Sequence, residues 1–226
     1  MDGPLGIRDY LSYAMAGAVV MLAAVWAWHG ELAFDEEISP VVVAMLLAAA
    51  YVLGHVVGHV SGRLTKFAFR WLGMPGAVVM DEHNAPPRVA RMFSRYVQPL
   101  PETTRKRIVR AAELRGLDPE AADFLKALRY VALPIVRDIG PDSPRLARSG
   151  MLEDFCRNLS FAAVVGALAT AIGAVVHGEV VLGFAAVVGI GCAWLFWYRS
   201  LHFKRLYYTI LFTTFAERVL TTETPD

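Results

Sequence analysis

The sequence predicts an all-α, polytopic integral membrane protein, with four transmembrane helices in two hairpins and a helical cytosolic domain between the hairpins. Four long apolar stretches contain no Asp, Glu, Lys or Arg, and the charged residues lie between them. Of the 226 residues, 56% are hydrophobic and 19% are charged, which is above and below the usual shares in soluble domains. No alternating strand pattern occurs, so helices are expected throughout.

The four stretches are long enough, or nearly so, to cross a membrane, because about 20 residues at 1.5 Å rise span a hydrocarbon core of about 30 Å. The first ends in Trp26, Trp28 and His29, which suits an interfacial anchor better than the cleavage site of a signal peptide. All are rich in Ala and Gly, a composition that favours close helix packing in lipid. The predicted spans are residues 11–28, 41–60, 159–176 and 180–197.

The charges predict the orientation. The loop at residues 30–39 and the turn at 177–179 contain acidic residues and no Lys or Arg, whereas all 22 Lys and Arg residues lie on the other side. The positive-inside rule then places both termini and residues 61–157 in the cytoplasm, and the expected location is the cell membrane, most simply a bacterial inner membrane. The predicted domains are an N-terminal hairpin (1–70), a cytosolic helical domain (71–157) and a C-terminal hairpin with a cytosolic helix (158–226).

The segment after the second span predicts a juxtamembrane basic helix. Arg63, Lys66 and Arg70 alternate with Leu64 and Phe67, a pattern typical of a helix on an anionic membrane surface. We favour this interpretation over nucleic-acid binding.

Capping and breaker residues predict the helices of the cytosolic part. We expect helices over 88–97, over 102–114 ending at Gly116, from Asp118 and Pro119 to about Leu133, and from Ser143 into the third span. The tail from 198 to 220 is expected to prolong the fourth span and to pack on the central domain. Interfacial lipid contact by its aromatic residues is the competing interpretation.

The second span contains a glycine ridge. Gly54, Gly58 and Gly62 recur every four residues, so they share one helix face on which another helix can approach closely. The ridge predicts either packing within the chain or self-association into a homo-oligomer.

His55 and His59 are also four apart and lie on one face next to the ridge. Three roles stay open: hydrogen bonds to Ser61, Asn158 or Ser160, a proton-linked role, and a metal or haem site. Two imidazoles supply only half of a tetrahedral ligand set, so no metal and no cofactor are predicted. Further ligands of suitable depth would have to come from Cys156, Glu153, Asp154 and His202.

The sequence contains no phosphate-binding loop, nucleophile elbow, zinc-protease pair or paired-carboxylate site. An enzyme is therefore the minority hypothesis. In layout alone, two membrane hairpins around a helical cytosolic domain resemble the small membrane effectors of bacterial antiviral systems, which implies an intracellular signal and a response in the membrane.

The function predicted first is an oligomeric, channel-like or membrane-perturbing protein controlled through its cytosolic domain. Its expected partners are the lipid bilayer, further copies of the chain, and a cytosolic protein or small-molecule signal, with no nucleic acid. The alternatives are an accessory or scaffold subunit of a membrane complex, and a membrane enzyme or metal or haem protein that uses the two histidines. The sequence leaves open the substrate, ion or signal, the number of subunits and the pathway.

Overall fold

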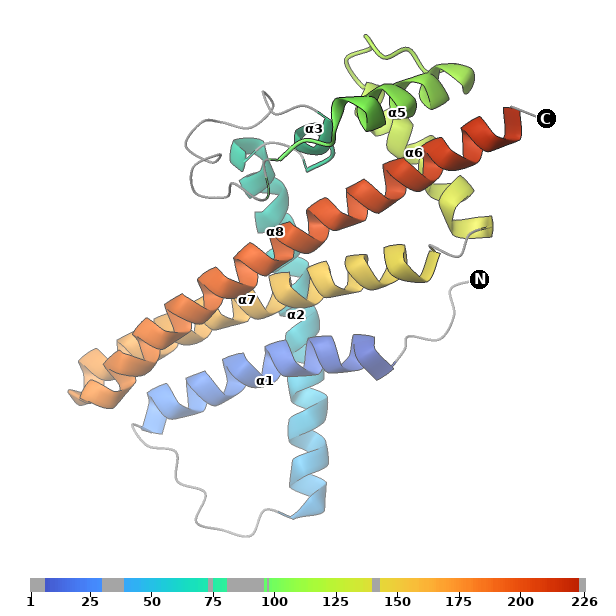
Figure 1. The fold of residues 1–226 in the computed structure, drawn as a ribbon. Helices are drawn as coiled ribbons and strands as arrows, with labels where there is room; N and C mark the ends of the chain where they lie inside the picture. The colour runs from blue at the N-terminus through green and yellow to red at the C-terminus, as the bar shows by residue number, and fades with distance from the viewer. Residues whose placement is uncertain are drawn as a thin grey trace. The chain divides into compact units, whose positions relative to one another are not determined.

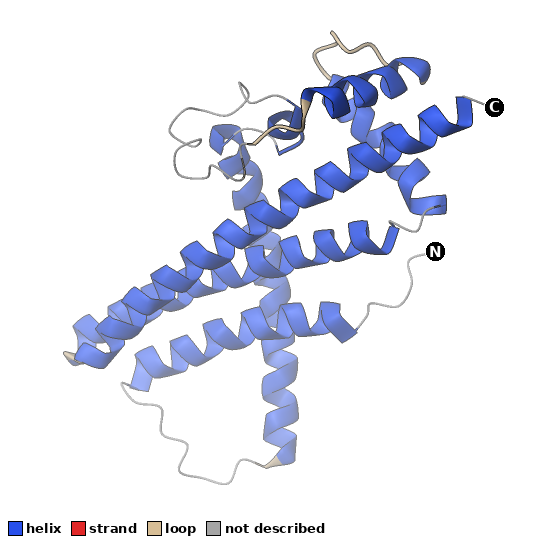
Figure 2. Cartoon of the chain, in the orientation of Figure 1, coloured by secondary structure: helices blue, strands red, loops and turns tan. Residues whose placement is uncertain are grey.

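A computed structural model describes residues 7–29, 39–72, 75–80, 96, 98–139 and 143–223. The described part contains helices and no strand (Figures 1 and 2). The prediction of an all-α chain is confirmed. The helices are α1 (Ile7–His29), α2 (Pro40–Leu72), α3 (Pro75–Met80), α5 (Glu102–Leu114), α6 (Phe124–Ile139), α7 (Ser143–His177) and α8 (Val180–Glu223).

Four of these helices are long and apolar enough to cross a membrane, which confirms the prediction of a multi-pass membrane protein. In α2, α7 and α8 the apolar part of the helix is longer than the predicted span. They are Ser12–His29 in α1, Pro40–Phe69 in α2, Pro144–His177 in α7 and Val180–Thr222 in α8.

The chain divides into two compact units. The first, called the membrane unit below, comprises Met1–Lys66 and Glu153–Ser200. The second, called the helical unit, comprises Phe67–Leu152 and Leu201–Asp226. Helices α2, α7 and α8 contribute residues to both units.

Small residues bring the helices of the membrane unit together. A side chain at Gly17 of α1 would overlap the backbone of Ala50 in α2, and one at Gly173 of α7 would lie 2.8 Å from the Cα of Ala27 in α1. A side chain at Gly189 of α8 would meet the Cβ of Ala167 in α7 at 3.0 Å. These contacts place helix backbones against one another, as the Ala- and Gly-rich composition predicts for helices in lipid.

The register of the contacts gives the helix directions in this unit. Along α1, residue 23 faces Gly166 and residue 27 faces Gly173, so α1 and α7 run parallel. Residues 13 and 17 of α1 meet residues 54–58 and 50–54 of α2, so these two helices cross at this place (Figure 1). Helices α7 and α8 form a hairpin, because Gly183 of α8 faces Ala174 of α7 and Gly189 faces Ala167. A hairpin of α1 and α2 stays a prediction.

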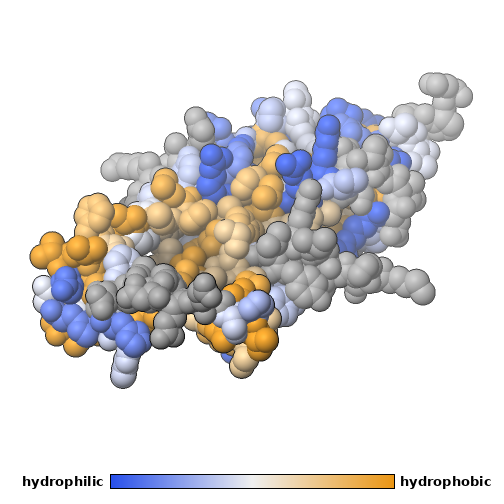
Figure 3. All heavy atoms as spheres, turned by 90° about the horizontal axis from the view of Figure 1, so that it is seen from below, coloured by the Kyte–Doolittle hydropathy of each residue, from blue (hydrophilic) through white to orange (hydrophobic). Residues whose placement is uncertain are grey.

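The large apolar side chains of this unit lie mostly at its surface. Every residue from 41 to 49 in α2 is exposed, and so are Ile172, Val175, Phe184 and Leu195 in α7 and α8. Broad apolar areas are visible in the space-filling view (Figure 3). Such a surface is favourable in hydrocarbon and unfavourable in water.

The helical unit has a core of large side chains. Ile108 of α5, Leu128 of α6 and Phe212 and Phe215 of α8 are fully buried and belong to one cluster. The prediction that the C-terminal tail packs on the central segment is thus confirmed. Tyr96 is buried beside this core, and burial, with a smaller effect from Tyr208, raises the pKa of its hydroxyl above the usual range.

Two predictions for α6 are wrong. Asp118 does not begin the helix; its Oδ1 accepts a hydrogen bond from the amide of Glu120 and closes a turn, and α6 begins at Phe124. Nor does α6 end before Pro134, which lies inside it. Pro134 removes the bond to the Tyr130 carbonyl, but both residues are on the exposed face, where water can bind that carbonyl.

Other predicted helices have mixed outcomes. The predicted start of α7 at Ser143 and the continuation of the fourth span to about residue 220 are confirmed. Apart from Tyr96, the predicted helix over 88–97 lies outside the described residues. The basic segment is the C-terminal part of α2. Arg63 and Lys66 are exposed there, and so are Leu64 and Phe67. The Arg70 side chain lies outside the described part, and contact of this segment with a membrane surface stays a prediction.

Candidate functional site: a polar cluster in the membrane unit

The glycine ridge of α2 is used within the chain over two of its three residues. A side chain at Gly54 would overlap the backbone of Tyr13 in α1, and one at Gly58 would lie 2.7 Å from the Tyr13 ring and 3.3 Å from the Asn158 Nδ2. A side chain at Gly62 would meet nothing within 4 Å. Packing within the chain therefore accounts for Gly54 and Gly58. A contact with another subunit stays a prediction, and only for Gly62.

His55 lies between two tyrosines. Its ring stacks on Tyr13 of α1 with the centroids 4.1 Å apart and an interplanar angle of 18°, and it meets the edge of Tyr51 at 4.6 Å and 89°. His55 and His59 are both exposed in the isolated chain. The aromatic contact joins α1 to α2 just where Gly54 lets their backbones approach.

Ser61, Asn158 and Ser160, the expected hydrogen-bond partners of the histidines, form hydrogen bonds with other groups. The Ser61 hydroxyl donates to the Asn158 Oδ1 at 2.7 Å and lies 3.0 Å from the Gly58 carbonyl. The Ser160 hydroxyl donates to the Ala193 carbonyl of α8 at 2.8 Å. These bonds tie α2 to α7 and α7 to α8, and neither of them involves a histidine.

An ion-pair network occupies the helical turn of α7 that directly precedes Asn158. Arg157 donates to Glu153 at 3.0 Å and contacts Asp154 at 2.7 Å. Glu153 is only 2% exposed, whereas half of the Asp154 side chain is exposed. The two carboxylates compensate the guanidinium, without which a buried charge would be strongly destabilising. Together with Ser61 and Asn158 these residues form what we call the polar cluster.

Two donors of the cluster lack acceptors among the described residues. They are the Nε of Arg157 and the Nδ2 of Asn158, both buried, and Asn158 is 1% exposed. An unpaired buried donor costs about 1–3 kcal/mol, so such a position is tolerated where water, an ion or a rearranged side chain supplies the missing acceptor. Within the described residues, the cluster is thus the one part of the membrane unit where buried side-chain donors have no acceptor.

The residues considered for a metal do not gather. Within the described part of the chain, no group of three His, Cys, Asp or Glu side chains is close enough to hold an ion. Glu153 and Asp154 are both paired with Arg157. Cys156 is a buried free thiol, and His202 lies in the helical unit, edge-on to Phe203 at 5.6 Å.

The sequence analysis named Glu153, Asp154 and Asn158 only as candidate partners or ligands of the histidines, and it missed Arg157 and the ion pairs that this residue makes. Arg157 is the last charged residue before the third span, so its position pointed to a membrane boundary and not to a site. A signal was available: Glu153, Asp154 and Arg157 have the spacings of three and four residues that allow ion pairs along a helix.

Comparisons with protein-family models, with curated proteins and with solved structures give no match to this chain.

Proposed function

We propose that this chain is a channel-like or membrane-perturbing protein that works as a homo-oligomer and is controlled through its helical unit. The layout that resembles bacterial antiviral membrane effectors suggests a role of this kind, in which an intracellular protein or small molecule acts on the helical unit. The proposal does not require a catalytic site, a metal or a cofactor.

One observation carries the proposal: a buried polar cluster in which two donors lack acceptors among the described residues, inside a unit whose outer surface is apolar. The cluster lies next to the ends of the second and third predicted spans, at the membrane boundary, and polar groups buried there still need partners. Asn158 is the central residue, because it joins α2 to α7 through Ser61 and its amide donor has no acceptor in the described part of the chain.

The histidines supply a route to pH control. Histidine is the side chain that ordinarily changes charge between pH 5 and 8. Protonation of His55 would convert its stack on Tyr13 into a cation–π contact, which would alter the contact between α1 and α2. His59 is one helical turn farther toward the polar cluster.

The test is a flux assay with the full chain in liposomes from about pH 5.5 to 8. We expect wild type to dissipate an ion gradient, Asn158→Leu to reduce the flux strongly, and His55→Gln with His59→Gln to remove its pH dependence. Thr170→Val is the matched control, because Thr170 is buried in the same helix but bonds only to carbonyls of its own preceding turn. Absence of flux from the wild-type protein across this pH range would refute the proposal.

The proposed orientation places both termini and the helical unit in the cytoplasm of a bacterial cell. It is supported by the sorting of the basic residues. An impermeant thiol reagent should label a cysteine at position 35 in intact cells and one at position 120 only after lysis, in a background with Cys156→Ala and Cys192→Ala. Labelling of position 120 in intact cells would reverse the topology.

A scaffold or accessory subunit is the second candidate function. It is favoured by α2, where residues 41–49 are exposed on every side of the helix and could contact helices of another protein. Light scattering of the detergent-purified protein separates the two candidates. A defined homo-oligomer that Gly62→Ile dissociates supports the first, and a monomer that co-purifies with one partner supports the second; stoichiometric zinc, iron or haem would instead favour a metal protein.

A further inference from the structure

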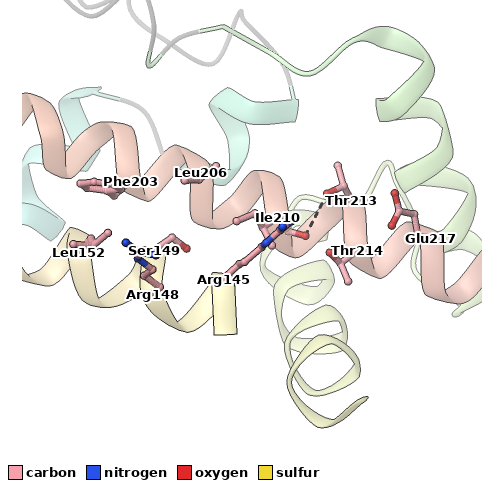
Figure 4. Close-up of a pocket in the computed structure, with 10 residues that line it drawn as sticks. All are labelled: Arg145, Arg148, Ser149, Leu152, Phe203, Leu206, Ile210, Thr213, Thr214 and Glu217. Carbon is pink, nitrogen blue, oxygen red and sulfur yellow. Dashed lines mark hydrogen bonds between the residues drawn. The ribbon is translucent and has the colours of Figure 1, made fainter. Parts of the chain in front are cut away.

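The groove between α7 and α8 in the helical unit has a volume of about 820 Å³ and two arginines in its lining. Arg148 lies beside Leu152, whereas Arg145 points toward the opposite end of the groove (Figure 4). Because the two guanidinium groups point apart, they do not form one anion site. The charges on α6 of the same unit are arranged more regularly.

One exposed stripe of α6 changes charge along its length. It begins with Asp123, whose carbonyl accepts the first amide bonds of the helix, and it reaches Arg137 in the last turn. Tyr130 lies seven residues from each of them. Seven residues make about two helical turns, so the three side chains share one face, and all three residues are exposed. The stripe is therefore acidic at one end, aromatic in the middle and basic at the other end.

The charges of this stripe are not paired within the described part of the chain. Neither Asp123 nor Arg137 forms an ion pair with another described residue. Tyr130 is 70% exposed, more than any other large apolar side chain described in the helical unit. Tyrosine and arginine are among the residues most enriched at interfaces between proteins. The stripe thus has the composition of an interface.

The order of the charges is self-complementary. If two copies of α6 lie antiparallel with one Tyr130 against the other, Asp123 of each copy lies opposite Arg137 of the other, because both are seven residues from the centre. The contacts are then the same in both directions, as a twofold axis requires. A parallel pair in the same register would place like charges side by side. The charge order therefore selects the antiparallel arrangement.

Pro134 adds a polar group to the same face. It has no amide hydrogen, so the Tyr130 carbonyl one turn earlier has no partner in the helix. In the antiparallel register Lys126 of the second copy lies opposite Pro134, since both are four residues from Tyr130. Lys126 is exposed, and its ammonium group can donate to this carbonyl. The second copy would thus supply the donor that Pro134 removes.

We propose that the helical units of two copies pair through α6, antiparallel about a twofold axis at Tyr130, with ion pairs between Asp123 and Arg137 of opposite copies. The inference rests on the homo-oligomer of the proposed function and names one of its contact surfaces. Charge complementarity favours a second copy as the occupant. Nucleic acid and an anionic lipid surface are negative throughout and would repel Asp123.

Cysteine cross-linking of the full chain in detergent tests the position of the axis. In a background with Cys156→Ala and Cys192→Ala, Tyr130→Cys places two thiols at the axis. Helix axes about 10 Å apart bring facing Cα atoms to roughly 5 Å, a distance that a disulfide can join. We expect mild oxidation to give a covalent dimer with Tyr130→Cys. The control is Arg107→Cys, an exposed position on α5 of the same unit, and equal cross-linking there would show random collision and overturn the proposal.

Charge reversal tests the register. Adding Arg137→Asp to the Tyr130→Cys chain sets like charges opposite each other at both ends of the pair, and it should slow cross-linking by at least about fivefold. Adding Asp123→Arg as well restores opposite charges and should restore the rate. Arg107→Asp is the matched control and should have no effect. If the chain with both reversals cross-links no faster than the chain with Arg137→Asp alone, the register is refuted; circular dichroism verifies that each variant is folded.

The outcomes separate this inference from the proposed function. A wild-type protein that is monomeric by light scattering would refute both. A wild-type homo-oligomer in which Tyr130→Cys gives no covalent dimer would refute only the pairing through α6, because the copies would then be held together by another surface.

Discussion

The membrane unit and the helical unit are packed by opposite means. The buried residues of the membrane unit are mainly small, such as Ala16, Ala162 and Ala167, and its large apolar side chains face outward. The helical unit buries Phe212 and Phe215 and exposes charged residues along α5. The two units therefore differ in where their large apolar side chains lie: at the surface of the membrane unit, which hydrocarbon favours, and in the core of the helical unit, which water favours.

Ion pairs differ between the units in the same way. Lys106 and Glu102 in α5, and Arg157 and Glu153 in α7, both have the spacing of four residues along a helix. The first pair is largely exposed and the second is almost wholly buried. The same spacing thus gives a surface pair of small energetic value and a buried pair whose partners depend on each other.

The largest expected effect comes from deleting a core ring in the helical unit. Phe215→Ala should destabilise the protein by about 3–5 kcal/mol, because it removes a fully buried aromatic side chain and leaves a cavity. Phe184→Ala is the matched change in the membrane unit, where the ring is 69% exposed, and it should alter stability little. Chemical denaturation in detergent measures both; equal losses would mean that exposure in the isolated chain misrepresents the packing of the membrane unit.

The second effect tests the small-residue packing. Gly54→Ala should destabilise the protein by about 1–3 kcal/mol, because the new methyl group would overlap the Tyr13 backbone and α1 and α2 would have to separate. In the detergent-solubilised monomer, Gly62→Ala should have the opposite sign and stabilise by about 0.5–1 kcal/mol, since the surroundings of Gly62 within the chain are open and Ala favours helix over Gly. Thermal melting of both variants measures the two changes in stability. A change of the same sign in both variants would argue against the close contact of α1 and α2 at Gly54.

The sequence was sufficient for the spans and for the long continuous helices α7 and α8, because a helix made of a long apolar block without charges is stable mainly in hydrocarbon. It failed at the start of α6. Asp118 and Pro119 form a good helix start locally, but Phe124, Leu128 and Val136 repeat on one buried face, and the core determined where the helix begins.

The site could be predicted only in part. The spacing of His55 and His59 identified a polar face on α2, since that spacing is a local property of one helix. The stack of His55 on Tyr13 and the bond from Ser61 to Asn158 join residues 42 and 97 positions apart. Such contacts depend on how α1, α2 and α7 cross, which the periodicity of one helix does not specify.

A smaller effect is expected in the polar cluster. Ser61→Ala removes the donor to the Asn158 Oδ1 and should cost about 0.5–2 kcal/mol, the range for hydrogen bonds between membrane helices. Adding Asn158→Leu should recover part of this loss, because replacing both partners with apolar groups leaves no unpaired atom. Chemical denaturation measures the stability of the two single variants and of the double variant. A double variant that is less stable than either single variant would show that Asn158 has other essential contacts.

The smallest effect is expected at the exposed pair of the helical unit. The hydrogen bond from Lys106 to Glu102, and then the charge of Lys106, lower the pKa of the Glu102 carboxyl. A lowered pKa in the folded state means that the pair stabilises above the ordinary carboxyl pKa of 4.5 and loses this contribution as the pH falls through the folded value. Both side chains are mostly in water, where double-mutant cycles find little energy in such pairs. Glu102→Gln should therefore leave the melting temperature at pH 7 unchanged, and the melting curves of wild type and variant should also coincide at pH 4. A clear loss of stability in the variant at pH 7 that persists at high salt would show that this pair is less exposed to water than the structure indicates, because salt screens buried pairs much less than exposed ones.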